Sequence, residues 1–132
     1  MKRMLAVALC AGAMAAAPLG VARAELVLAM FERTGCIHCR MWNDQIGPIW
    51  PRTAEGAVAP LFRIDLDRPL PEGITLASRP VFTPTFVLLR DGVELDRLEG
   101  YPGEDFFWGL IGGMLREQPE WAMQDSAEGA LE

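Results

Sequence analysis

The chain has 132 residues, of which 51% are hydrophobic, and its 18 acidic residues outnumber 12 basic ones for a net charge of −6 at pH 7. A chain of this length is expected to form one domain with a modest core. The excess of negative charge argues against a nucleic-acid-binding protein and against docking on anionic membranes.

Residues 1–24 have the pattern of a cleavable secretory signal. Lys2 and Arg3 supply positive charge, residues 4–21 are uncharged and almost wholly apolar, and Ala22-Arg23-Ala24 places small residues where a signal peptidase reads them. An uncleaved anchor helix is the alternative, but the apolar run is short for spanning a bilayer. Cleavage would leave 108 residues with nine arginines, no lysine and all 18 acidic residues, for a net charge of −9.

The rest of the chain carries strand and helix patterns in turn. Residues 26–31 form a continuous apolar run, which suits a central strand buried on both faces. The alternation over 93–98 suits an edge strand, and Asp91-Gly92 before it predicts a hairpin turn. We expect strands over 26–31, 61–66, 85–90 and 93–98, and helices over 36–46 and 104–117.

The segments between and after these elements are expected to be connections. Residues 67–83 contain three prolines, with a helical turn around 74–78. Pro119 is expected to end the last helix, so that residues 118–132 form an acidic, mobile tail. Trp121 in this tail could dock on its own domain or on a partner.

The order of the elements predicts the class of fold. A strand-helix-strand unit followed by a strand-strand-helix unit gives an α/β fold with a four-stranded mixed sheet flanked by helices. The last helix presents an apolar stripe for the core, in which we include Phe106 and Phe107. The predicted organisation is therefore a signal in 1–24, a domain in 25–117 and a tail in 118–132.

Cys36-Ile37-His38-Cys39 holds the only thiols left once Cys10 departs with the signal. A disulfide staple across two residues closes too short a loop to stabilise the fold much. A structural zinc site needs four ligands, whereas this tetrapeptide holds two cysteines and the only histidine. Carriage of Cu(I) by the dithiol is the remaining metal alternative. We expect a redox dithiol with no metal and no cofactor.

The position of the motif at a helix start favours nucleophilic chemistry. Unpaired backbone N–H groups and the helix dipole stabilise a thiolate there. We expect Cys36 to attack a substrate disulfide and Cys39, one turn inside, to resolve the mixed disulfide. Arg33, His38 and Arg40 add positive charge, which would make the disulfide more oxidising.

The CxxC motif after an apolar strand, Thr83-Pro84-Thr85 before another strand, and the closing hairpin and helix resemble the thioredoxin superfamily. The resemblance covers nearly all of the mature chain. It implies a cis Thr83–Pro84 bond against the dithiol, although most X–Pro bonds are trans. It also implies that the backbone at Thr83 pairs with a substrate peptide.

More narrowly, the chain resembles the small periplasmic thioredoxins of sulfur-oxidation (Sox) gene clusters, of the SoxS or SoxW type. This resemblance implies a monomer in the periplasm that reduces a disulfide or a mixed thiol adduct on an exported partner, such as a sulfur-oxidation carrier protein. It implies electrons from a membrane dithiol carrier. A disulfide oxidase or isomerase is the competing enzyme role, because the histidine before the second cysteine is similar to those groups.

The chain departs from ordinary thioredoxins at three places. Met30 stands where they have a buried aspartate that assists proton transfer at the second cysteine. Gly35 replaces their tryptophan, and Ile37-His38 replaces their Gly-Pro. Without the carboxylate, Cys39 must lose its proton to water, to His38 or to the substrate thiolate.

Overall fold

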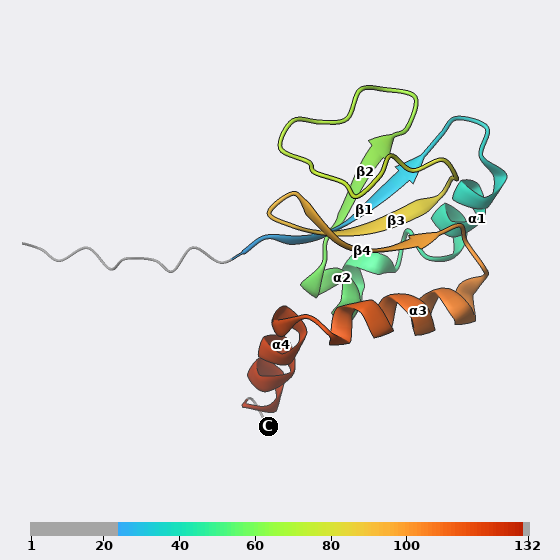
Figure 1. Cartoon of the computed structure of the whole chain (residues 1–132). Coiled ribbons are helices and arrows are strands. Elements are labelled where there is room, and N and C mark those ends of the chain that lie inside the picture. Colours follow the sequence, from blue (N-terminus) through green and yellow to red (C-terminus); the bar gives the residue numbers. More distant parts are fainter. Residues whose placement is uncertain (1–23, 131–132) are drawn as a thin grey trace, which may run out of the picture.

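The computed structural model describes residues 24–130, so the predicted signal lies outside the described residues except for its last position. Figure 1 shows a four-stranded sheet with helices packed below it. The strands are β1 (Leu26–Glu32), β2 (Leu61–Asp65), β3 (Thr85–Arg90) and β4 (Val93–Glu99). The helices are α1 (Ile37–Gln45), η1 (Trp50–Arg52), α2 (Ala54–Val58), α3 (Glu104–Arg116) and α4 (Pro119–Gly129).

The sheet is mixed, as the order of the elements predicted. Its strands lie in the order β2-β1-β3-β4, with β1 and β2 parallel and the other two pairs antiparallel. The Asp91-Gly92 turn joins β3 to β4. Gly92 has φ +81° and lies against the backbone of Gly73, where a Cβ would collide, so both its conformation and its surroundings require glycine.

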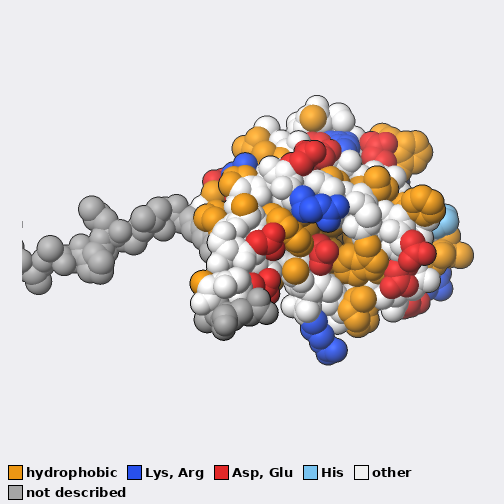
Figure 2. All heavy atoms as spheres, turned by 90° about the horizontal axis from the view of Figure 1, so that it is seen from below, with side chains coloured by type: hydrophobic (Ala, Val, Ile, Leu, Met, Phe, Trp, Pro, Cys, Tyr) orange, Lys and Arg blue, Asp and Glu red, His pale blue; other side chains and the backbone are white. Residues whose placement is uncertain are grey.

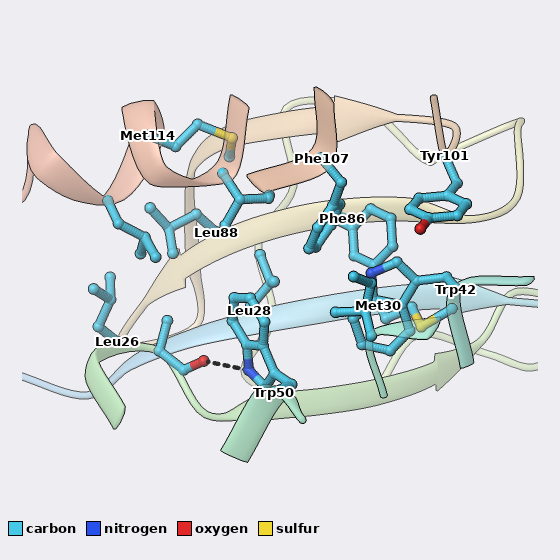
Figure 3. Packing of buried hydrophobic residues seen from close by; sticks show 14 of the residues in the cluster. Leu26, Leu28, Met30, Trp42, Trp50, Phe86, Leu88, Tyr101, Phe107 and Met114 are labelled. Carbon is cyan, nitrogen blue, oxygen red and sulfur yellow. Dashed lines mark hydrogen bonds between the residues drawn. The ribbon is translucent and has the colours of Figure 1, made fainter. Parts of the chain in front are cut away.

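The helices cover one face of the sheet. Leu28 and Met30 of β1 point into the core on this face, together with Phe86 and Leu88 of β3 and the aromatic rings of α1, η1 and α3 (Figure 3). Phe107 lies among five other rings, with centroid distances from 5.0 to 6.1 Å. The indole N–H of Trp50 donates to the carbonyl of Ala59 over 3.1 Å, which fixes η1 beneath the sheet.

The other face of the sheet is covered by the connection between β2 and β3. Leu70, Ile74 and Leu76 of this connection pack on a second cluster that includes Phe31 and Val87. The predicted helical turn over 74–78 is wrong: Thr75 instead pairs with β4, because its N–H donates to Gly92 and its carbonyl accepts from Glu94. This pairing uses the backbone N–H and C=O of Thr75, so neither is left for a helical turn.

The C-terminal segment also differs from the prediction. Pro119–Gly129 form the helix α4, and its first turn is packed on the domain, with Glu120 5% exposed. Trp121 packs against the main core, which corresponds to the first of the two predicted alternatives. The predicted mobile tail over 118–132 is therefore corrected: Pro119–Gly129 form a helix whose first turn packs on the domain.

The apolar stripe of α3 is narrower than expected. Phe107, Ile111, Met114 and Leu115 are buried, whereas Phe106 and Leu110 are 71% and 47% exposed. Each of these two residues precedes a buried one, and one step along a helix turns a side chain by about 100°. The placement of Phe106 in the core was therefore wrong. Figure 2, seen from below the helices, shows apolar side chains on this surface among charged ones.

Candidate active site: the Cys36–Cys39 disulfide

Cys36 and Cys39 form a disulfide between the end of β1 and the start of α1. Cys36 is the N-cap of α1, and its Sγ accepts a hydrogen bond of 3.1 Å from the N–H of Cys39. Gly35, with φ +81°, makes the turn that leads into this cap. In the reduced protein the same N–H group and the helix dipole would favour a thiolate on Cys36.

The two cysteines differ in their exposure. Cys39 is 3% exposed and lies in the main core with Met30, Trp42 and Phe86. Cys36 is only partly buried, and Ile37 after it is 62% exposed. An incoming sulfur therefore reaches Cys36 before Cys39.

The Thr83–Pro84 segment lies beside the dithiol. The bond between these residues is cis, Pro84 is buried, and Thr83 shares a groove with His38. Val81 and Phe82, directly before them, are 68% and 61% exposed. These two residues were not predicted from the sequence, although two large apolar residues before a Thr-Pro pair are a signal that could have identified them.

The groove has a volume of 330 Å³ and is lined by His38, Thr83, Glu99, Gly100, Tyr101 and Pro102. It brings Glu99, from the end of β4, to the same hollow as the histidine of the motif. Nothing near Cys36 in the sequence predicts this carboxylate. It enters the site because β4 pairs with β3, and Thr85 lies opposite Glu99 in that pairing.

The positive charge predicted around the sulfurs is partly neutralised. The Nε of Arg33 lies 2.8 Å from the carboxylate of Asp67, which follows β2. Arg40 and His38 are exposed on α1. The surroundings of the dithiol thus combine the exposed basic residues His38 and Arg40 of α1 with the Arg33–Asp67 ion pair and the carboxylate of Glu99.

Tyr101 closes the groove from the side of α3. Its hydroxyl donates to Oε1 of Gln45 over 2.6 Å, which ties the loop before α3 to the end of α1. Burial raises the pKa of Tyr101, and the nearby charge of Glu104 adds to this effect. The phenol is therefore a neutral hydrogen-bond donor rather than a base.

Met30 lies on β1 in the same core cluster as Cys39. Its Sδ is 3.8 Å from Nη1 of Arg63, and the same nitrogen binds both carboxylate oxygens of Glu32 at 3.0 and 3.1 Å. The guanidinium of Arg63 lies 6.0 Å from the centroid of the Trp42 ring. Arg63 and Glu32 beside Met30 are thus paired with each other, and Met30 itself cannot accept a proton.

Two further properties of the described chain bear on the site. Within residues 24–130, no group of three or more histidine, cysteine, aspartate or glutamate side chains could hold a metal ion. Binding of copper would therefore depend on the two cysteine sulfurs. None of the helices in the same part of the chain is long and apolar enough to cross a membrane.

A four-stranded mixed sheet, a CxxC disulfide at the start of the first helix and a cis proline beside it define a thiol-disulfide oxidoreductase of thioredoxin fold. Neither a scan of protein-family models nor a search of curated proteins found a match. Solved structures do match. The periplasmic thioredoxin SoxS from Paracoccus pantotrophus, in its reduced form, is 52% identical over 67% of this chain and 93% of its own, with a TM-score of 0.65. The chain belongs to the thioredoxin family.

Two other thioredoxins match less closely. Thioredoxin-2 of the malaria parasite, described as a component of its protein secretion machinery, is 18% identical over 69% of this chain and 84% of its own, with a TM-score of 0.48. The Malassezia sympodialis thioredoxin Mala s 13 is 24% identical over 67% of this chain and 74% of its own, with a TM-score of 0.45.

Proposed function

We propose that this protein is exported to the periplasm, where it reduces a disulfide or a mixed thiol adduct on a partner protein of a sulfur-oxidation system. The likeness to a periplasmic thioredoxin named SoxS supports the compartment and the partner class. The signal pattern in residues 1–24 supports the export. The contrast between an accessible Cys36 at a helix N-terminus and a buried Cys39 is the observation that carries the reaction.

In the proposed reaction, the thiolate of Cys36 attacks one sulfur of the partner's disulfide. A bond forms between Cys36 and that sulfur, and the other partner sulfur leaves as a thiolate that takes a proton from solvent. The thiol of Cys39 then loses its proton and attacks Cys36, which releases the second partner sulfur. The partner gains two electrons, and the protein is left with the Cys36–Cys39 disulfide. A membrane dithiol carrier is proposed to reduce it again.

The direction of this reaction depends on the charge around the dithiol. The exposed His38 favours the alternative of an oxidase or isomerase, since positive charge stabilises the thiolate and makes the disulfide more oxidising. The ion pair of Arg33 with Asp67 and the position of Glu99 in the groove beside His38 reduce that effect. These two carboxylates support the reducing direction.

Trapping tests the roles of the two cysteines. A Cys39→Ser variant exported in the native host should accumulate mixed disulfides with its partner, because Cys36 attacks and nothing resolves the product. Cys36→Ser is the matched control and should accumulate none. If Cys36→Ser traps partners and Cys39→Ser does not, the proposed roles are reversed.

Two measurements on the purified protein separate the alternatives. A reduction potential well above about −150 mV would support the oxidase and contradict the reductase. Stoichiometric, tight Cu(I) binding without any reduction of insulin disulfides would support a copper carrier instead.

A further inference from the structure

The groove beside His38 carries an acidic group, Glu99, that shares its arginine partner with a second carboxylate. The side chain of Glu99 is 47% exposed, and its ion pair with Nη1 of Arg97 is long, at 3.7 Å. The guanidinium of Arg97 is engaged elsewhere: its Nε and Nη2 lie 2.6 and 2.7 Å from the carboxylate of Glu94. Nη2 also donates to the carbonyl of Ser78. Glu99 therefore offers a negative charge to an incoming molecule.

The segments that carry the dithiol and Thr83 also expose apolar side chains. Ile37, Val81 and Phe82 are large side chains that are each more than 60% exposed, and they adjoin the dithiol and Thr83. Large exposed apolar side chains beside a reactive group are typical of a contact surface for a partner. An extended segment that presents its cysteine to Cys36 would thus meet these apolar side chains as well as Glu99.

We propose that Glu99 selects partner segments that carry a basic residue close to the reacting cysteine. This inference rests on the proposed reduction of a protein partner and adds the chemistry of the segment that is recognised. A lysine or arginine of the partner would pair with the Glu99 carboxylate in the groove, whereas an acidic residue would be repelled. Neither Arg33 nor Arg40 lines this groove.

Two matched peptides test the proposal. Each carries one cysteine as a mixed disulfide with a chromogenic thiol, and they differ only in an arginine or a glutamate two residues from that cysteine. The dithiol protein, kept reduced with dithiothreitol, should release the thiol from the arginine peptide at least about fivefold faster in kcat/KM, which corresponds to about 1 kcal/mol. Subtraction of the rate with dithiothreitol alone gives the protein's contribution.

The Glu99→Gln variant should reduce this preference to less than about twofold, and high salt should weaken it in the native protein. Asp96→Asn is the matched control, because it removes the same charge from the same strand but from the opposite face. It should leave the preference unchanged. Equal rates for both peptides, or a preference that survives in Glu99→Gln, would overturn the inference. Failure to reduce either peptide would instead contradict the proposed function.

A second, independent observation concerns Glu25, the residue after the predicted cleavage site. Its backbone nitrogen lies 2.8 Å from Oδ1 of Asp91, and the Asp91 N–H donates back to the Glu25 carbonyl over 2.8 Å. The adjacent hollow of 240 Å³ is lined by Glu25, Glu72 and Asp91 as its only charged residues among those described. Arg90 beside them is bound to Glu120.

We infer that removal of the signal after Ala24 creates an ion pair that the precursor lacks. In the precursor the Glu25 nitrogen is a neutral amide, whereas in the mature chain it is an α-ammonium that faces Asp91. Free α-amino groups titrate at about 7.7–8.0, and a neighbouring carboxylate makes the ammonium hold its proton more tightly. The pair therefore adds stability at pH 7 that is lost as the pH rises through the titration of the ammonium.

The test compares the mature chain beginning at Glu25 with one that retains Gly-Ser-Ala24 before it. The mature chain should unfold at a higher urea concentration at pH 7, and the difference should disappear at pH 10. In the Asp91→Asn background the two chains should unfold together at both pH values; asparagine tolerates the positive φ of 50° at this position. Equal midpoints at pH 7, or an N-terminus other than Glu25 in the exported protein by mass spectrometry, would overturn the inference.

Discussion

Nη2 of Arg90 lies 2.7 Å from Oε2 of Glu120, which joins the last residue of β3 to the first turn of α4. Nε of the same guanidinium binds Oε1 over 2.8 Å, so the pair is bidentate. The hydrogen bonds that Arg90 donates to Glu120 raise the pKa of Arg90, so the arginine stays charged. The helix after Pro119 is thereby fixed to a central strand of the sheet.

Replacement of Glu120 by alanine should destabilise the fold. The side chain of Arg90 is only 27% exposed, and loss of its partner would leave a poorly solvated charge. We expect a decrease of about 2–4 kcal/mol in the free energy of unfolding, measured by urea denaturation. Glu128→Ala, on an exposed position of the same helix, should change it by less than about 0.5 kcal/mol. Equal effects of the two variants would contradict a structural role for this ion pair.

A second ion pair makes stability depend on pH. Hydrogen bonds from Arg97 lower the pKa of Glu94, and the N–H of Ala77 adds to this effect. A carboxyl whose pKa is lowered by folding stabilises the protein above its ordinary value, here 4.5, and this stability is lost as the pH falls through the lower value. The native protein should therefore lose stability between about pH 5 and pH 3.

Glu94→Gln should flatten that dependence, because the amide does not titrate. It should also lower the free energy of unfolding at pH 7 by about 1–3 kcal/mol, since Glu94 holds the Ala77 region against β4. Urea denaturation at a series of pH values measures both effects. Glu117→Gln, at the exposed end of α3, serves as the control. If Glu94→Gln keeps the acid dependence of the native protein, as the control Glu117→Gln should, the ion pair of Glu94 with Arg97 does not cause that dependence.

The sequence predicted most of the sheet because its central strands are buried on both faces. A strand such as β3 then appears as an unbroken apolar run, and its predicted bounds, 85–90, agree with the structure. The prediction that a helix ends before Pro119 is confirmed, because α3 ends at Arg116, but the helix that begins at Pro119 was missed. Proline is equally suited to the first turn of a helix, where its missing N–H has no partner to lose, and here it begins α4. The short α2, capped by Thr53, was missed for lack of length.

Residue spacing predicted the candidate site only where its residues are neighbours in the sequence, whereas Thr83 and Pro84 were predicted from the family resemblance. The dithiol and His38 lie within four residues, so their chemistry could be inferred from spacing. Glu99 and Asp67 reach the site through strand pairing and through the chain that follows β2. No local pattern contains these contacts, which is why the positive charge around the sulfurs was overestimated.

Substitution by alanine should affect the stability of the fold very differently at two adjacent residues of α3. Phe107 is fully buried among the rings of the core, whereas Phe106 is 71% exposed. Phe107→Ala should lower the free energy of unfolding by about 3–5 kcal/mol, because it leaves a cavity among the aromatic side chains. Phe106→Ala should change it by less than about 1 kcal/mol. Denaturation by urea compares them directly, and a large loss in Phe106→Ala would show that its ring is covered in solution.

Met30 offers a test of how Cys39 loses its proton. Met30→Asp would place a carboxyl group in the core beside Arg63, whose charge is already shared with Glu32. Burial raises the pKa of such a carboxyl, so its neutral form is favoured in the fold. The variant should lose about 2–4 kcal/mol of stability at pH 8 and less at pH 5, because a group with a raised pKa stabilises the fold most when the pH is low. Met30→Leu should lose less than about 1.5 kcal/mol.

The same variant should change the second step of the reaction. If proton loss from Cys39 limits release of the partner, the introduced carboxylate should speed the decay of the mixed disulfide on Cys36 at pH 8 relative to Met30→Leu. Acid quenching followed by mass spectrometry measures this decay for a peptide disulfide. A rate that is unchanged while the pH dependence of stability shifts as expected would mean that the carboxyl group is present but that another step limits release.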